Sequence, residues 1–270
     1  MSNTPGTTDA CDSAAAVVLA KLADHVALVT INRPEARNAV NAAVAQGLEA
    51  AIDATEADDD IWVVILTGTG ADAFSAGADL KAVSGGHGAG LATARGGFAG
   101  FVHAPRSKPW IAAVNGPALA GGCEIMLACD LVVAVPGARF GLPEVKRGLV
   151  ASAGGLYRLP RRIPSAIARE MILTGEPIGA ERALQLGLIN ALAPADGLLA
   201  AAQALAARIT VNAPLAVRQS LGVARQALDL TDAELRAASA QAQQAVYASE
   251  DFKEGPRAFI EKRAPRWTGR

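Results

Sequence analysis

Two turns in this 270-residue chain are of the kind that brings backbone N–H groups to a ligand. In the first, Gly121 and Gly122 follow the apolar run 110–114 and precede a helical pattern from Glu124 to Cys129. Glycines at a helix N-terminus let N–H groups approach a ligand closely, and the helix dipole there favours negative charge. A turn needed only for tight packing has the same sequence, so this motif alone leaves both interpretations open.

The second turn is the segment 74–81, Phe-Ser-Ala-Gly-Ala-Asp-Leu-Lys, which also follows an apolar run. Its Ala78 can supply a second N–H. Two backbone donors that converge on one carbonyl oxygen form an oxyanion hole, in which each donor typically lowers the reaction barrier by about 3–4 kcal/mol. The expected chemistry is polarisation of a carbonyl group, provided that Ala78 and Gly121 converge in the fold.

Two glutamates lie on either side of a third apolar run, 131–135. Glu124 precedes this run, and Glu144 follows it in the segment Phe140–Glu144. Burial and mutual repulsion separate the pKa values of paired carboxyl groups, so that one can donate a proton while the other accepts one. A helix-terminal or surface charge is the alternative for each glutamate, because most glutamates in proteins are exposed.

The elements that must position these residues are predicted from hydrophobic periodicity. Apolar runs rich in β-branched residues indicate strands that are buried on both faces. They span 26–31, 62–67, 110–114 and 131–135. Between the first two runs, Val44, Leu48 and Ile52 recur every four residues, which is typical of an amphipathic helix, and the acidic turn 58–60 ends it.

From about residue 163 onward the strand signals nearly vanish and helical patterns follow. These patterns cover 166–174, 181–188, 198–209, 215–228 and 233–248. The chain is therefore expected to be an α/β core followed by a helical region, with no low-complexity linker between them. We predict a flexible N-terminal tail at 1–13, a catalytic core at 14–200 and a C-terminal helical region at 201–270 that belongs to the same domain unit.

Composition excludes several classes of protein. The chain has 25 basic and 26 acidic residues. Because a nucleic-acid-binding protein needs an excess of basic residues to replace phosphate counterions, we expect no nucleic-acid partner. No uninterrupted run of about 18 apolar residues occurs, so no membrane-spanning segment is predicted. The polar N-terminus lacks the charged and apolar regions of a signal peptide.

The cysteines and histidines predict neither a metal site nor a Ser-His-Asp triad. The cysteines are odd in number and lack the spacing of metal ligands, which favours a reducing, cytoplasmic location. The histidines are isolated in the sequence, and each is expected to be a surface or structural residue. These residues are Cys11, Cys123, Cys129, His25, His87 and His103.

Taken together, the motifs resemble the enoyl-CoA hydratase/isomerase (crotonase) superfamily. The resemblance spans nearly everything after the N-terminal tail, with the segments in the family's order. They are 31–39 (Ile-Asn-Arg-Pro-Glu-Ala-Arg-Asn-Ala), 77–79, 113–116, 121–124, 141–144, 173–175, 187–189 and 259–263. The resemblance implies a crotonase-like spiral of ββα repeats with a C-terminal α-helical trimerisation region. It also implies a homotrimer, or a hexamer built as a dimer of trimers.

The resemblance further implies roles at the matching positions. Ala78 and Gly121 look like the oxyanion-hole donors to a thioester oxygen, and Glu124 and Glu144 look like the two catalytic glutamates of hydratases, the general base and the general acid. Retention of both glutamates favours an enoyl-CoA hydratase, which adds water in the syn sense to a trans-2-enoyl-CoA and gives a 3-hydroxyacyl-CoA. No metal and no other cofactor is expected, since CoA is part of the substrate.

Two other functions remain open. One is an enoyl-CoA isomerase or another crotonase-type reaction, in which a single glutamate moves a proton and no water is added. The other is a catalytically silent protein that only binds acyl-CoA. The identity of the acyl group is not readable from the sequence.

The family pattern also assigns CoA contacts and shows where this chain departs from it. Residues implied to contact the acyl-CoA are Ala36, Arg37, Ala76, Asp79, Leu80, Lys81, Phe259 and Lys262, and the last two reach the CoA of a neighbouring subunit. Ala151 and Ser152 stand where hydratases commonly carry Pro-Gly. In the family the backbone of that glycine helps to position the catalytic water, so Ser152 is expected to alter the placement of this water or the fit of the substrate. Ala120 replaces the first of three glycines, and this change is expected to have a smaller effect than the change at Ala151 and Ser152. Glu35 stands where many relatives have lysine.

Overall fold

A six-stranded sheet forms the centre of the chain, of which the computed structural model describes residues 15–22, 24–86 and 88–270. β1 pairs with β2 in the antiparallel sense, and all other neighbouring strands are parallel. In sheet order the strands are β1 (Val17–Lys21), β2 (Val26–Ile31), β3 (Val63–Gly68), β6 (Trp110–Val114), β8 (Leu131–Ala134) and β11 (Ala191–Leu192). The predicted tail at 1–13, with Cys11, lies outside the described residues, and so does His87.

The four strands predicted from apolar runs are the four central strands of this sheet. Every residue of β6 is buried, as expected for a strand that is covered on both faces. In the register of the sheet, Val64 lies beside Trp110 and Ile111 lies beside Leu131. The predicted α/β core is therefore confirmed.

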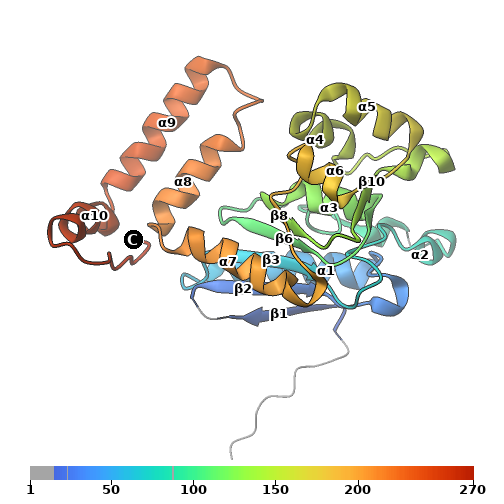
Figure 1. Cartoon of the computed structure of the whole chain (residues 1–270), viewed down its shortest axis with the longest axis horizontal. Coiled ribbons are helices and arrows are strands. Elements are labelled where there is room, and N and C mark those ends of the chain that lie inside the picture. The colour runs from blue at the N-terminus through green and yellow to red at the C-terminus, as the bar shows by residue number, and fades with distance from the viewer. Residues whose placement is uncertain (1–14, 23, 87) are drawn as a thin grey trace, which may run out of the picture.

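Two long helices pack against the sheet. α1 (Ala42–Ala57) contacts β1 and β2 and buries Val44, Leu48 and Ile52, as predicted. The side chain of Asn41 caps its N-terminus by accepting the Val44 N–H at 3.0 Å. α7 (Leu198–Thr210) lies along β3 and β6, and Figure 1 shows it running beside the strands.

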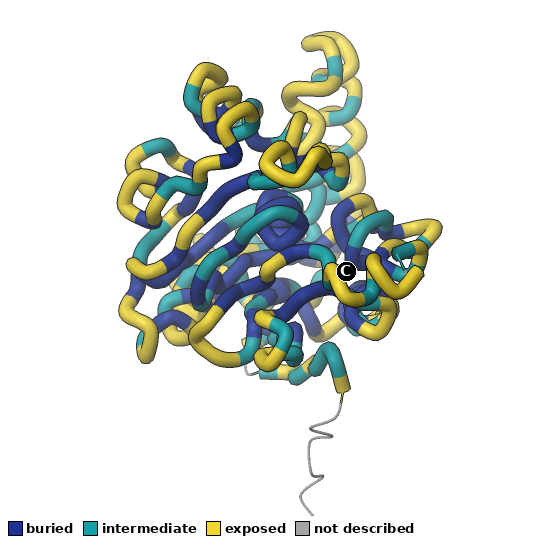
Figure 2. The backbone as a smooth tube through the Cα atoms, turned by 90° about the vertical axis from the view of Figure 1, so that its right-hand side faces the viewer, coloured by how far each residue is buried: buried dark blue, intermediate teal, exposed yellow. Residues whose placement is uncertain are grey.

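The C-terminal third leaves the sheet as an extension of helices. In Figure 1, α8 (Pro214–Ala224) and α9 (Asp232–Tyr247) pack side by side, and α10 (Glu250–Ile260) lies at the lower end of α9, away from the connection between α8 and α9. Figure 2 shows buried backbone concentrated in the sheet and exposed backbone over outlying helices. The other α-helices are α2 (Leu80–Ser84), α3 (Gly121–Ala128), α4 (Gly155–Arg162), α5 (Ser165–Thr174) and α6 (Ala180–Gln185).

None of the helices in 15–22, 24–86 and 88–270 is by itself long and apolar enough to cross a membrane. Only a pair bent by 102°, Ala195–Thr210 with Pro214–Ala224, meets that test of length and composition jointly.

Two small sheets lie beside the central one. The first has the order β10 (Ile178–Gly179), β9 (Arg139–Gly141) and β7 (Ala118–Leu119), and β7 runs parallel to β9. The second is a hairpin of β4 (Ala92–Thr93) and β5 (Gly97–Phe98). Because β7 precedes α3 and β9 precedes Glu144, their pairing brings the two glutamate-bearing segments to one side of the core.

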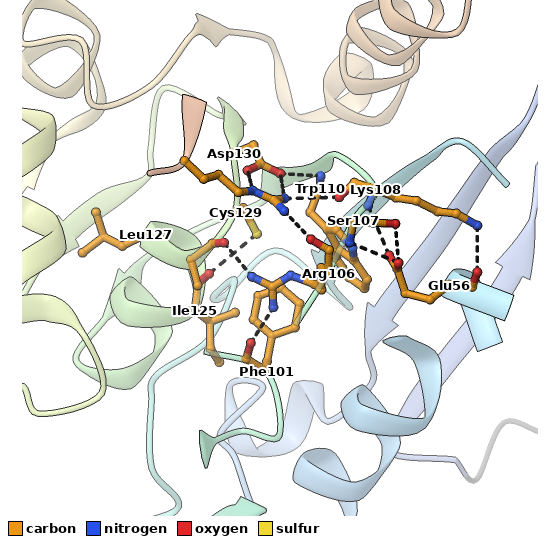
Figure 3. A network of polar contacts seen from close by, with 12 residues as sticks. Glu56, Phe101, Arg106, Ser107, Lys108, Trp110, Ile125, Leu127, Cys129 and Asp130 are labelled. Carbon is orange, nitrogen blue, oxygen red and sulfur yellow. Dashed lines mark hydrogen bonds and ion pairs between the residues drawn. The ribbon is translucent and has the colours of Figure 1, made fainter. Parts of the chain in front are cut away.

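A network of polar contacts fixes the segment between β5 and β6 and ties the helical extension to the core (Figure 3). Arg106, which stacks on Phe101 with 4.0 Å from its Cζ to the ring centroid, donates hydrogen bonds to Phe101 O and Ala128 O. Lys108 donates to carbonyls at the end of α1, including Asp58 O at 2.7 Å. Arg225, just after α8, pairs with Asp130 at 2.8 Å.

Several elements differ from the sequence predictions. β1, α4 and α10 were not predicted, and neither were the two-residue strands β10 and β11. α3 begins at Gly121 instead of Glu124, and α8 ends at Ala224 instead of Leu228.

Candidate active site

One cavity of about 1110 Å³ lies next to the segments that follow the carboxyl ends of β3 and β6. This is the edge at which parallel sheets commonly bind ligands. Ten of the twelve residues singled out from the sequence line it: Ala36, Arg37, Ala76, Ala78, Asp79, Leu80, Lys81, Gly121, Glu124 and Glu144. The structure thus brings together residues that are up to 108 positions apart, from Ala36 to Glu144.

Phe259 and Lys262 do not line this cavity. Phe259 lies on α10 with 85% of its surface exposed, and Lys262 follows the end of that helix. Their expected contact with the CoA of a neighbouring subunit stays a prediction.

The backbone at Ala78 is oriented by a parallel bridge to Val40. The Val40 N–H donates to Gly77 O at 2.8 Å, and the Asp79 N–H donates to Val40 O at 2.9 Å. In such a bridge the N–H of the central residue points to the opposite side. Across the described part of the chain, no backbone or side-chain acceptor pairs with the Ala78 N–H, which leaves this donor for a ligand.

Gly121 lies directly beside the Ala78 turn. A Cβ atom added to Gly77 would lie 2.8 Å from Gly121 N, so the two turns are in backbone contact. Gly121 is the first residue of α3, where an N–H has no partner within the helix. The two N–H groups are therefore neighbours at the cavity wall, as an oxyanion hole requires.

Close packing explains the glycines of this turn. A Cβ on Gly121 would overlap the ring of Phe98, and a Cβ on Gly122 would overlap Ser75 O. Ala120, in contrast, has a side chain at φ 51° and ψ −128°, a backbone conformation that L-residues rarely adopt. Strain of this kind typically amounts to about 1–3 kcal/mol. The replacement expected to be mild therefore places strained backbone immediately before the Gly121 N–H.

Glu124 is buried on α3 and points into the cavity. Its Oε1 accepts the N–H of Gly155 at 2.9 Å. Burial raises the pKa of Glu124 to about 7, the Gly155 hydrogen bond opposes this rise, and the charge of Glu144 adds to it. A carboxyl group with a pKa near neutrality can take up and release a proton under physiological conditions.

Glu144 lies in the 3-10 turn Pro143–Arg147 that follows β9. Burial raises the pKa of its carboxyl group, an effect that its own backbone N–H and Arg147 oppose. Its Oε2 atom is buried and has no hydrogen-bond partner among the described residues. Since buried polar atoms are normally paired, this oxygen is suited to a ligand or a water molecule.

The segment 151–155 completes this side of the cavity. Ser152 and Ala153 line the cavity, and Gly155 holds Glu124. Arg158 on α4 fixes the segment by donating from Nη1 to Ala153 O at 3.2 Å. The departures from the family pattern at Ala151 and Ser152 therefore lie in the same turn as the partner of Glu124, and their effect on a bound water stays a prediction.

Asp79 has a role that the sequence did not reveal. Its carboxylate pairs with Arg33 at 3.0 Å and accepts the Lys81 N–H at 3.0 Å, which caps α2. Burial would raise its pKa, but these partners outweigh the effect and lower it. The carboxylate thus positions the turn that carries Ala78, while Arg37 and Lys81 are cationic groups on the cavity wall.

Sequence reasoning missed part of the cavity lining. Phe98 lines the cavity from the β4–β5 hairpin, where no periodic pattern marked it. His103 is exposed, as expected of a surface residue, and it also lines the cavity, which its sequence position did not indicate. Arg33 stands inside the motif 31–39, and that motif was the available signal.

The raised pKa of Glu124 predicts a pH-dependent stability. The protonated form contributes stability that is fully present below the ordinary value of 4.5 and is lost as the pH rises through about 7. Glu124→Gln cannot ionise. As the pH rises from 5 to 8, the free energy of unfolding of this variant should therefore increase by about 1–3 kcal/mol relative to that of the wild type. Urea unfolding at both pH values measures this gain, and a difference that does not change with pH would contradict the assignment.

Known proteins resemble this chain along most of its length. A family model described as "Enoyl-CoA hydratase/isomerase" matches residues 21–270. A carnitinyl-CoA dehydratase of Salmonella arizonae is 40% identical over 246 residues, which cover 89% of this chain and 94% of the relative. An enoyl-CoA hydratase structure from Mycobacterium tuberculosis H37Rv is 48% identical, with a TM-score of 0.90 over 95% of this chain and 100% of that one. A carnitinyl-CoA hydratase structure from Mycobacterium avium is 47% identical, with a TM-score of 0.75 over 95% and 99%.

Proposed function

The chain belongs to the enoyl-CoA hydratase/isomerase family, and from this premise we propose that it adds water to the 2,3 double bond of a trans-2-enoyl-CoA to give a 3-hydroxyacyl-CoA. The family and its fold make it a hydratase-type enzyme, a hydro-lyase. One observation carries the proposal about the reaction. Buried Glu124 and half-buried Glu144, both with raised pKa values, line the same cavity as two unpaired, adjacent backbone N–H groups.

The proposed reaction begins with the thioester oxygen bound between the Ala78 and Gly121 N–H groups. These donors withdraw electron density from the carbonyl, which makes the β-carbon electrophilic and stabilises the enolate-like oxygen that develops during the addition. The dipole of α3 acts in the same direction, because Gly121 is at its N-terminus. These backbone donors act without any proton transfer of their own.

The two glutamates then divide the proton transfers. Ionised Glu124 takes a proton from water as the water oxygen bonds to the β-carbon, and Glu144 delivers a proton to the α-carbon. Gly155 orients the Glu124 carboxylate, and the unpaired Oε2 of Glu144 is available to the water or the substrate. Because the two carboxyl groups line one cavity, the hydroxyl and the α-proton are proposed to add to the same face of the double bond.

The CoA moiety is proposed to extend from the thioester toward Arg37 and Lys81, whose charges suit its phosphates. Phe259 and Lys262 are proposed to reach the CoA bound to a neighbouring subunit of a homotrimer or a hexamer. The exposed position of Phe259 is in keeping with a role outside its own chain.

A second candidate reaction is favoured by the names of the Salmonella relatives. Dehydration of carnitinyl-CoA removes water from the β-carbon, which is the same chemistry in the reverse direction. The same two glutamates and backbone donors serve both directions. The two candidates differ in the acyl group and in the direction of the reaction.

A panel of enoyl-CoA thioesters tests the proposal. The absorbance of the conjugated thioester should disappear, and the product mass should rise by one water, for at least one trans-2-enoyl-CoA. Carnitinyl-CoA and its dehydrated enoyl form belong in the same panel. A product of unchanged mass would indicate an isomerase instead, and tight binding without turnover across the panel would indicate a silent acyl-CoA-binding protein.

A further inference from the structure

We propose that His103, which lines the cavity and is hydrogen-bonded to Tyr157, provides a hydrogen-bonding subsite at the acyl end of the cavity, which takes an uncharged oxygen group, such as a hydroxyl, carried by the acyl chain beyond the double bond. This inference depends on the proposed function, because it names the substrate class of the same site. It follows from the position, the fixation and the charge state of His103.

A chain of contacts links His103 to the segment that holds Glu124. Arg158 links this residue to the site, because its Nη2 donates to Val102 O at 2.5 Å and its Nη1 donates to Ala153 O at 3.2 Å. Ala153 is next but one to Gly155, the partner of Glu124. These contacts connect His103, which lines the cavity, to the segment that holds Glu124, and they do not involve Arg37 or Lys81, the cationic residues assigned to CoA.

The walls around this end are mainly apolar. Phe98 packs its ring against the backbone of Gly121 and lines the cavity. Leu149 and Val150 are further apolar residues of the lining. An acyl stem of a few carbons fits such walls. His103 adds a polar ring to them, so the end of the cavity is not matched to a plain hydrocarbon.

His103 is held in one place by its neighbours. Its backbone N–H donates to Gly96 O at 2.9 Å, and its ring lies against Gly97, where an added Cβ would be 2.5 Å from Nδ1. Nε2 lies 3.1 Å from the hydroxyl oxygen of Tyr157, a residue of α4 that is 54 positions away. The turn that follows is fixed by Arg106, which bonds to Phe101 O in the network of Figure 3.

The charge state of the His103 ring favours an uncharged substrate group as its partner. Burial and the nearby charge of Arg158 lower the pKa of His103, so the ring is uncharged at neutral pH. A neutral imidazole beside a phenol presents both a donor and an acceptor. A hydroxyl or carbonyl oxygen on the substrate can pair with such a site, whereas a methyl group would leave its polar atoms without a ligand partner.

Isosteric substrate pairs test the proposal directly. Each pair matches an ω-hydroxy-2-enoyl-CoA with the 2-enoyl-CoA in which a methyl group replaces the hydroxyl, for example 6-hydroxyhex-2-enoyl-CoA with hept-2-enoyl-CoA. At the chain length that reaches His103, the wild type should favour the hydroxyl member in kcat/KM by about tenfold, since a site that bonds a hydroxyl discriminates against the analogue that lacks it. Equal or better turnover of the methyl member at every length overturns the proposal.

Variants assign the preference to the two side chains. His103→Leu and Tyr157→Phe should each reduce the hydroxyl-to-methyl ratio to about one or below, whatever happens to the absolute rate. His25→Leu is the matched control, because His25 stacks on Trp62 away from the cavity and should leave the ratio unchanged. An unchanged ratio in Tyr157→Phe, which removes one exposed hydroxyl, contradicts the proposal even where His103→Leu fails to fold.

Binding separates this inference from the proposed reaction. Dissociation constants of the saturated thioesters 6-hydroxyhexanoyl-CoA and heptanoyl-CoA, and of their shorter homologues, need no turnover. A lower dissociation constant for a hydroxyl-bearing thioester supports the subsite, even if no enoyl-CoA is hydrated. In that case only the proposed reaction fails. Equal constants at every length, with hydration intact, overturn the subsite alone.

Discussion

Glu124→Gln and Glu144→Gln are each expected to lower kcat for hydration by about two to four orders of magnitude, the usual contribution of a positioned general acid or base. Gln keeps the size of Glu and can still accept the Gly155 N–H at position 124, so the change removes proton transfer and little else. Because the two groups act in one step, the double variant should lose little more than either single variant. Steady-state kinetics with one good enoyl-CoA measure all three.

The control for this prediction is Glu170→Gln, an exposed glutamate on α5 that should have the wild-type rate. Thermal unfolding must show that the active-site variants remain folded. Near-normal turnover in both single variants would show that the carboxylate pair does not perform the reaction.

Loss of the Gly121 N–H is expected to reduce kcat by about 10²–10³-fold, the effect of removing one oxyanion-hole donor. Proline deletes this N–H, and the first position of a helix tolerates proline well, because no helical hydrogen bond is lost there. Since a side chain at position 121 would overlap the ring of Phe98, the substitution is made together with Phe98→Ala. The comparison is between Phe98→Ala/Gly121→Pro and Phe98→Ala/Gly121→Ala.

The alanine variant is the matched control, since it adds a Cβ but keeps the N–H. Both double variants should unfold at similar temperatures and differ mainly in kcat. Equal kcat values in the two folded variants would mean that the Gly121 N–H does not stabilise the transition state.

The central strands could be predicted because burial on both faces leaves a clear signal in the sequence. The runs at 26–31 and 110–114 match β2 and β6 residue for residue. β1 was missed because it is an edge strand, partly exposed, and its apolar run at 14–20 consists largely of alanine, which is not typical of strands. α10 was missed because Gly255 and Pro256 lie inside it and normally interrupt a helix.

The convergence of the site could not be read from residue types. Ala78 and Gly121 meet through backbone bridges, Val40 with Ala78 and Ser75 with Ala118, which leave no side-chain signal. The strain at Ala120 likewise depends on φ and ψ, and the same alanine would be unremarkable in a different backbone conformation. Motif resemblance supplied the pairing of these turns, and the structure supplies the contact between them.

His103 shows a second limit of sequence reasoning. An isolated histidine carries no signal of its own, and its partner Tyr157 is on a helix that was not predicted. The segment before it contains a hairpin of two-residue strands, too short for any periodic pattern. The place of His103 in the cavity lining therefore became visible only in three dimensions.

Turnover of a 2-enoyl-CoA in ¹⁸O-labelled D₂O tests most directly whether the two carboxylates add water across a double bond polarised by the paired amides. The 3-hydroxyacyl product should carry one ¹⁸O at the β-carbon and one deuterium at the α-carbon, both on the same face. Deuterium in the acyl chain without ¹⁸O, or addition on opposite faces, would contradict the account.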